Sequence, residues 1–178
     1  MENNLPENSL AEAIHKQLIS EAERRLIYEG LNRIKKCLSG LTDEEIWWRP
    51  NEQSNSVGNL LLHLAGNVRQ WVLTGIGNQE DTRERDKEFS ETGPIPTEAL
   101  ILQLEAVLNE TLAFLQKLKT ADLVKDYSVQ GFRETGVSIL IHVIEHFSYH
   151  VGQITYFVKA NKNLDTGYYS GIDLSKKS

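Results

Sequence analysis

Apolar residues return every three or four positions along four long stretches of this chain, and this period constrains its fold more than any other feature. The stretches cover residues 9–38, 56–76, 97–119 and 136–160. A recurrence of this kind places apolar side chains on one face of a helix, whereas a β-strand alternates apolar and polar residues. Four long amphipathic helices predict an all-α fold, in which the apolar faces pack together as a four-helix bundle.

The connections between these stretches are of different kinds. Residues 78–96 carry many charges and no apolar period, which predicts a long solvated loop after the second helix. Long loops in small domains are often functional lids, but a plain surface connection is the commoner case, and the sequence leaves both open. Residues 126–136, with Gly131 as the turn, predict a short extended segment or small hairpin before the fourth helix.

Length and charge limit the classes of protein to consider. The 178 residues suit a single domain over 1–178. A formal net charge of −6 argues against a protein that binds nucleic acid, because such proteins carry a basic surface. No apolar run approaches the roughly 20 residues that span a bilayer, and the polar N-terminal residues are unlike a signal peptide. We therefore expect a cytoplasmic protein with no membrane partner.

Histidines are concentrated in the fourth predicted helix. With only one cysteine in the chain, Cys37, a cysteine-rich zinc site is excluded. His142, His146 and His150 are four residues apart, a spacing that brings imidazoles to one side of a helix, where two of them can share a metal ion. The alternative for each is a hydrogen-bonded core histidine, the commoner case for a single histidine on an apolar face.

The apolar face of the fourth helix favours an interior position for two of these residues. A spacing of four and three residues over 139–160 includes His146, His150 and Gln153, and this is the seam that a bundle helix turns toward its partners. His63 lies between apolar residues of the second helix in the same way. Burial of three unpaired imidazoles is costly. A metal ion shared by the three would satisfy them and leave a position for water or substrate.

Two segments resemble a known family. The second helix contains NLLLHLAGNVRQW and the fourth contains HVIEHFSYHVGQI, which is similar to the H-x-x-x-H-x-x-x-H-x-G-Q pattern of the DinB-like superfamily. The resemblance covers residues 10–160 and implies a four-helix bundle that holds a divalent metal ion by His63, His146 and His150. His142 matches a position that is usually not a primary ligand, so the resemblance implies that it supports a ligand or holds a water molecule.

The sequence also departs from the common family pattern. That pattern has a histidine directly before the last ligand and an arginine after it, whereas this chain has Tyr149 and Val151. We expect Asn67, Trp71, Tyr149 and Gln153 near the open side of the ion, where they would shape a pocket. For Tyr149 a position in the core is an equally good alternative.

The resemblance also implies a class of activity. The superfamily includes bacillithiol transferases and mycothiol-dependent maleylpyruvate isomerases, which use a low-molecular-weight thiol, but the chain resembles the uncharacterised branch at least as much. We therefore expect a metal-dependent thiol S-transferase that adds such a thiol to a small-molecule electrophile, with Zn, Ni or Fe as the ion. A metal-dependent hydrolase needs the same ligands, and a non-catalytic, metal-stabilised binding protein is a further alternative. The resemblance also suggests a homodimer.

Overall fold

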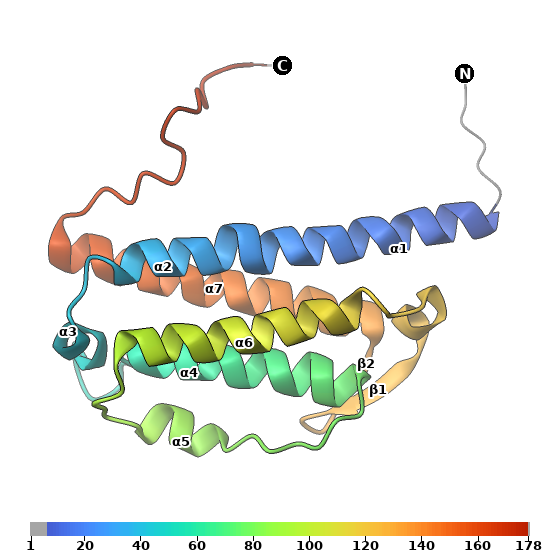
Figure 1. Cartoon of the computed structure of the whole chain (residues 1–178), viewed down its shortest axis with the longest axis horizontal. Helices are drawn as coiled ribbons and strands as arrows, with labels where there is room; N and C mark the ends of the chain where they lie inside the picture. The colour runs from blue at the N-terminus through green and yellow to red at the C-terminus, as the bar shows by residue number, and fades with distance from the viewer. Residues whose placement is uncertain (1–6, 178) are drawn as a thin grey trace.

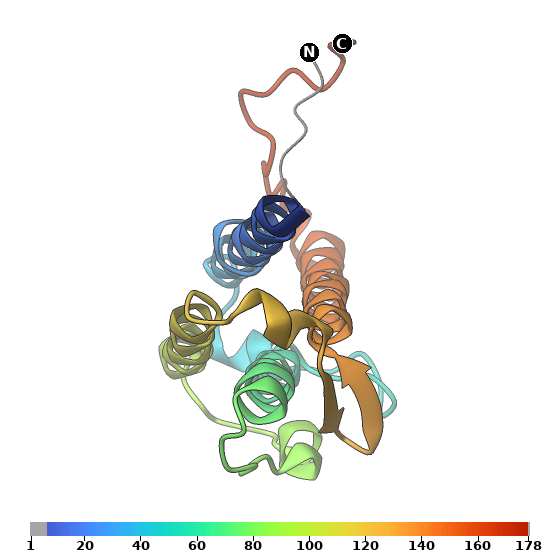
Figure 2. The ribbon, with the colours of Figure 1, turned by 90° about the vertical axis from the view of Figure 1, so that its right-hand side faces the viewer.

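The computed structural model describes residues 7–177 and confirms that the fold is mainly helical. Four long helical rods lie side by side and make up most of the molecule (Figure 1, Figure 2). In chain order the rods are α1 (Glu7–Glu23) with the π-helical η1 (Arg24–Leu31) and α2 (Asn32–Leu38); α4 (Val57–Val68) with the π-helical η2 (Arg69–Ile76); α6 (Thr97–Leu115); and α7 (Gly136–Lys162).

Shorter elements connect the rods. They are α3 (Asp43–Trp47), α5 (Arg85–Ser90), the 3-10 helix η3 (Thr120–Val124) and the strands β1 (Asp126–Val129) and β2 (Phe132–Thr135). The two strands form an antiparallel hairpin in which Val129 pairs with Phe132. Gln130 and Gly131 at its turn both have positive φ, the backbone that two-residue hairpin turns require. The hairpin packs against η2 and the start of α7.

The segment 78–96 is not the fully solvated loop that its charges predict. It contains α5, which lies along α4 (Figure 1) and buries Glu88. Asn59, near the start of α4, donates from Nδ2 to the backbone oxygens of Glu88 and Glu91, at 2.9 and 2.8 Å. These bonds hold the segment against the second rod.

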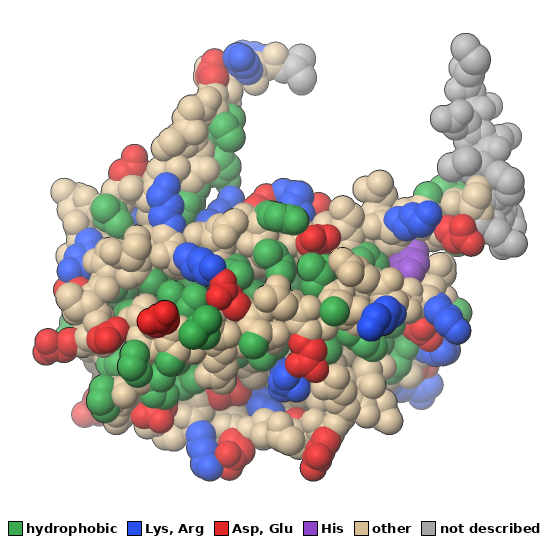
Figure 3. Space-filling model, in the orientation of Figure 1, with side chains coloured by type: hydrophobic (Ala, Val, Ile, Leu, Met, Phe, Trp, Pro, Cys, Tyr) green, Lys and Arg blue, Asp and Glu red, His purple; other side chains and the backbone are tan. Residues whose placement is uncertain are grey.

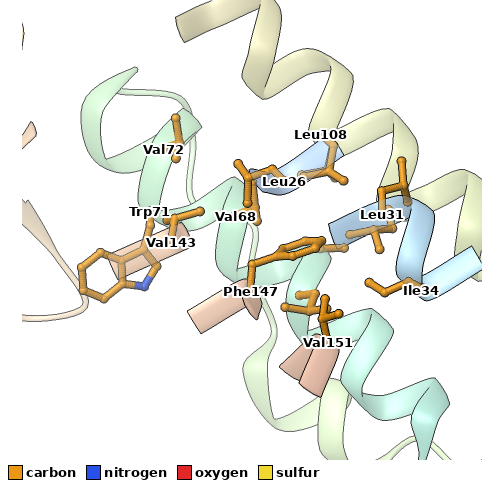
Figure 4. Packing of buried hydrophobic residues seen from close by; sticks show 14 of the residues in the cluster. Leu26, Leu31, Ile34, Val68, Trp71, Val72, Leu108, Val143, Phe147 and Val151 are labelled. Atoms are coloured by element: carbon orange, nitrogen blue, oxygen red, sulfur yellow. The ribbon is translucent and has the colours of Figure 1, made fainter. Parts of the chain in front are cut away.

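The rods meet in one apolar core. Phe147 of α7 is fully buried, and Figure 4 shows its ring beside Leu26 of η1 and Val68 of α4. Leu108 of α6 belongs to the same cluster. The first and fourth rods approach closely at Gly30, where a Cβ atom would lie 2.6 Å from Cε1 of Phe147. Burial of side chains of this size is the main favourable term in folding.

The buried stripe of α7 differs from the predicted seam. The buried positions of this helix are Gly136, Ile139, Leu140, Val143, Phe147, His150, Val151, Ile154 and Val158. Gln153 and Ala160, which the seam places inside, are exposed. The stripe follows the 3.6-residue period of an ordinary α-helix and so drifts away from a 3.5-residue seam. His146 and His150 lie along its edge.

The surface carries a mixture of charges. On the face shown in Figure 3, acidic and basic side chains are intermingled, and neither sign forms a continuous area there. Within residues 7–177, no helix combines the length and the apolar character needed to cross a bilayer.

Candidate metal centre

Three imidazoles from two rods converge between α4 and α7. His63 lies on α4, and His146 and His150 lie one turn apart on α7. Nε2 of His146 is 3.1 Å from Nε2 of His63 and 3.2 Å from Nε2 of His150. One ring nitrogen of each residue lies within 4.8 Å of the others. The structure therefore brings together the three residues that the resemblance implies as ligands.

The outer nitrogens of two of these rings face hydrogen-bond acceptors. Nδ1 of His63 lies 2.9 Å from Oε2 of Glu88, and Nδ1 of His150 lies 2.7 Å from Oε1 of Gln153. A carboxylate or amide oxygen accepts hydrogen bonds, and these contacts favour the tautomer with the proton on Nδ1 of each ring. Each Nε2 then has a lone pair directed toward the other rings, and this is the form of imidazole that binds a metal ion.

His146 provides the test of whether an ion fits. Its Nε2 faces the lone pairs of His63 and His150, and one N–H can satisfy only one of them. Its Nδ1 is buried and has no hydrogen-bond partner in the described part of the chain. A cation that accepts the lone pairs of all three Nε2 atoms would satisfy this cluster at once, with the proton of His146 on Nδ1. The donor set fits a divalent ion of the zinc type.

Burial keeps two of these imidazoles, those of His146 and His150, neutral. Desolvation, together with the charges that His150 and His63 can carry, lowers the pKa of His146 from 6.5 to about 3. Desolvation also lowers the pKa of His150, against an opposing hydrogen bond with Gln153. At neutral pH, His146 and His150 are therefore in the state that binds metal ions.

The buried carboxylate of Glu88 contacts His63, and it was not predicted from the sequence. Oxygens Oε1 and Oε2 of Glu88 accept from Nε and Nη2 of Arg83, at 2.7 and 2.8 Å. Burial acts to raise the pKa of Glu88, but hydrogen bonds from Arg83 and then His63 lower it below its usual range, so the group is charged at neutral pH. Residues 78–96 contain several other acidic residues, and no spacing in the sequence distinguishes Glu88 from them.

His142 packs beside the three rings without joining them. Its ring stacks on Trp71 with centroids 3.8 Å apart and lies 5.5 Å from the ring of His146. Trp71 is itself buried, and its Nε1 donates to Oε1 of Gln130 in the hairpin turn, at 3.2 Å. Trp71 and His142 thus form an aromatic wall that joins the hairpin to the histidine group.

The other predicted pocket residues divide into buried and exposed. Asn67, one turn beyond His63 on α4, is buried. Tyr149 is 62% exposed, so the alternative that places it in the core is wrong. Nε2 of Gln153 donates to the hydroxyl oxygen of Tyr149 at 3.1 Å, while its Oε1 accepts from His150. Tyr149 and Gln153 therefore mark a side on which the histidine group is close to the surface.

The match to one protein family covers most of the chain. The model of a family described as "Protein of unknown function (DUF1572)" matches residues 13–172. No curated protein matches the chain.

Solved structures of similar fold include proteins from three bacteria. A conserved protein from Enterococcus faecalis is 17% identical with a TM-score of 0.67, over 79% of this chain and 94% of that one. A DinB-like protein from Bacillus cereus is 19% identical with a TM-score of 0.61, over 77% and 88%. A DinB-like protein from Bacillus subtilis is 19% identical with a TM-score of 0.59, over 81% and 90%. At these identities the likeness concerns the fold.

Proposed function

This chain belongs to the DUF1572 family, and on that premise we propose that it is a member of the DinB-like superfamily, whose fold it shares, and a metal-binding four-helix bundle that acts on a small molecule. The ion would be held by His63, His146 and His150. The observation that carries this proposal is the convergence of three Nε2 atoms. In two of these rings, His63 and His150, Nδ1 faces a side-chain oxygen that can accept a hydrogen bond.

Three imidazole ligands suit several ions. Zinc, nickel and iron all accept nitrogen donors of this kind, and in a cell the supply of each metal contributes to which one is bound. A set of three protein ligands is also the number that catalytic zinc sites use, because it leaves a coordination position for water or substrate. We therefore propose one of these three metals.

The proposed reaction is the transfer of a low-molecular-weight thiol to a small electrophile. A metal ion supplies the chemistry for this, because it lowers the pKa of a bound thiol or water so that the anion exists at neutral pH. The chain itself brings three imidazole nitrogens together. It also presents Tyr149 and Gln153 beside His150, where their polar groups can contact an incoming substrate.

Two alternatives use the same residues. Metal-dependent hydrolysis of a small molecule needs the same three ligands, with hydroxide in place of thiolate. A non-catalytic binding protein would use the ion for stability alone. By the resemblance to the superfamily, we also propose that residues 1–178 form one domain and that the protein is a homodimer.

The test replaces one ligand and one unrelated histidine. We expect His150→Ala to lose its bound metal and any thiol-conjugation activity together, because two imidazoles bind an ion less tightly than three. We expect His15→Ala to keep both, since His15 lies on α1 and contacts Thr120, 3.1 Å away. Metal analysis of the purified proteins and a thiol-conjugation assay with a generic electrophile are the measurements.

The outcomes separate the alternatives. A His150→Ala protein that stays fully active with no metal bound contradicts a catalytic metal. A wild-type protein that holds metal but shows no thiol-dependent turnover, and that unfolds when the metal is removed, supports the non-catalytic alternative. Thiol-independent hydrolysis supports the hydrolase.

A further inference from the structure

Arg83 and Glu88 form an ion pair that is buried on both sides. Their side chains are 3% and 10% exposed, whereas in every other Lys or Arg ion pair between described residues both side chains are at least 22% exposed. Removing an ion from water costs several kcal/mol, and a buried pair often contributes no net stability to a fold. This buried ion pair is therefore better explained by the side chain that it positions than by a contribution to the stability of the fold.

The pair holds the ring of His63. Arg83 grips both oxygens of the Glu88 carboxylate, and its Nη1 donates to Oε1 of Gln70 at 2.9 Å, so its guanidinium is fixed at both ends. The carboxylate in turn faces Nδ1 of His63 at 2.9 Å. The aromatic ring of Phe89 packs against the same imidazole, with centroids 4.7 Å apart. The orientation of His63 is thus determined by residues of the segment 78–96.

A glycine on α4 makes room for this contact. Gly66 follows His63 by three residues and lies on the same side of the helix. A Cβ atom at Gly66 would lie 1.9 Å from Oε1 of Glu88 and 2.9 Å from Nε of Arg83. Any larger residue at this position would therefore push the carboxylate away from the helix.

We propose that Glu88 is a positioning residue of the metal centre. Its carboxylate accepts the Nδ1 proton of His63, which leaves the lone pair on Nε2 and aims it at the other two histidines. Carboxylates that accept from the outer nitrogen of a metal-bound histidine fix its tautomer and increase its basicity. This inference rests on the proposed function, since it assigns to Glu88 and Arg83 a part in holding the same ion.

Arg83 lies close enough to Nδ1 of His63 to donate a hydrogen bond there, which would favour the other tautomer of the ring. Its Nη2 lies 3.1 Å from Nδ1 of His63, and if it donated there, the proton of the imidazole would sit on Nε2 and block metal binding. The contact to Glu88 is shorter, and Nη2 already donates to the carboxylate at 2.8 Å. The geometry therefore favours the Nδ1–H tautomer, and the two arrangements predict different spectra.

The experiment measures the tautomer and the metal affinity separately. Nitrogen-15 NMR of histidine-labelled, metal-free protein at neutral pH should show His63 protonated on Nδ1. Affinity for Zn²⁺, measured by competition with a chromophoric chelator, should fall roughly 10–100-fold in Glu88→Ala. Gly66→Ala should produce a similar loss, although residue 66 is not itself a candidate ligand. Glu88→Gln should lose less, because its amide oxygen can still accept the proton.

A matched control comes from the same segment. Glu84 is exposed and pairs at the surface with Lys87, at 2.7 Å, so Glu84→Gln should bind Zn²⁺ like the wild type. If Glu88→Ala does not fold, the proposal is tested by the Zn²⁺ affinity of the nearly isosteric Glu88→Gln and by the tautomer of His63 in the wild type. An Nε2–H tautomer in the wild type, or unchanged Zn²⁺ affinity in folded Glu88→Ala, overturns this inference alone. A wild-type protein that takes up none of Zn²⁺, Ni²⁺ and Fe²⁺ overturns the proposed function.

Discussion

At the scale of single residues, His146 has the most unusual environment of the three candidate ligands. It touches both of the other rings through one nitrogen, and its other nitrogen is buried without a partner within residues 7–177. Desolvation and the adjacent imidazoles hold its pKa at about 3. In the unfolded chain the same side chain regains a pKa near 6.5.

We expect the metal-free protein to lose stability as the pH falls from about 6.5 to about 5. The folded pKa of His146 lies below the unfolded one, so in this window the unfolded chain takes up a proton that the folded protein does not, and the free energy of unfolding decreases. Above the unfolded pKa the contribution is fully present. Urea unfolding at several pH values measures the change, and most carboxylates stay ionised across this window.

The control for this prediction is His146→Gln, which lacks the titrating ring. Its free energy of unfolding should depend less on pH between about 6.5 and 5. Equal slopes for the variant and the wild type would show that the pH dependence arises elsewhere.

The sequence predicts the histidines of the site but not the groups that hold them. His63 and His150 stand out because each is a polar residue within an apolar helical period, and this contrast can be read from the sequence alone. Glu88 has no such contrast, since it lies among many charges, and its burial results from α5 packing on α4 around Gly66. Gln153 is found at the site, but as an exposed partner of His150 and not as part of the seam.

At the scale of elements, one glycine lies in the contact between η1 and α7, and a second glycine, on α7, lies outside it. Gly30 faces the ring of Phe147 so closely that a Cβ atom would overlap two of its carbons, at 2.6 and 2.8 Å. Gly152 lies on the exposed side of α7, and an added Cβ atom would meet nothing within 4 Å. The same substitution should therefore have opposite effects at these positions.

Gly30→Ala should destabilise the protein by roughly 1–3 kcal/mol, because overpacking forces the ring or the helix to move. Gly152→Ala should stabilise it by up to about 1 kcal/mol, since alanine favours a helix interior more than glycine does. Chemical unfolding of the two metal-free variants measures both changes. If Gly30→Ala were as stable as Gly152→Ala, the first and fourth rods would not be in the described contact.

The elements also show which parts of the fold the apolar period predicts and which parts it does not. The long helices were predictable because each repeats its apolar period over many turns. The predicted seam of α7 departs from the buried stripe beyond His150, because several apolar stripes fit its sequence and the packing of Phe147 against the other rods selects one. The helix α5 has six residues, too few to establish a period.

At the scale of the whole molecule, the candidate ligands tie separate parts of the chain together. His63 belongs to the second rod, His146 and His150 belong to the fourth, and Glu88 reaches the group from the segment between the second and third rods. An ion at this point would link these parts in the folded protein, whereas the unfolded chain holds no such site.

Metal binding should therefore raise the melting temperature. A ligand that binds only the folded state adds about 2.7 kcal/mol at a free concentration 100 times its dissociation constant. We expect a chelator to lower the melting temperature while the circular dichroism at room temperature stays helical, because the apolar core remains. A protein that unfolds on chelation at room temperature would contradict this and indicate a purely structural ion.

The distance along the chain between the candidate ligands also has a consequence for biosynthesis. His63 and His146 are 83 positions apart, so at roughly 5–20 residues per second a ribosome adds the second roughly 4–17 s after the first. A nascent chain that ends before α7 offers only one of the three imidazoles. A cation held by all three histidines would therefore be acquired only after α7 has been translated.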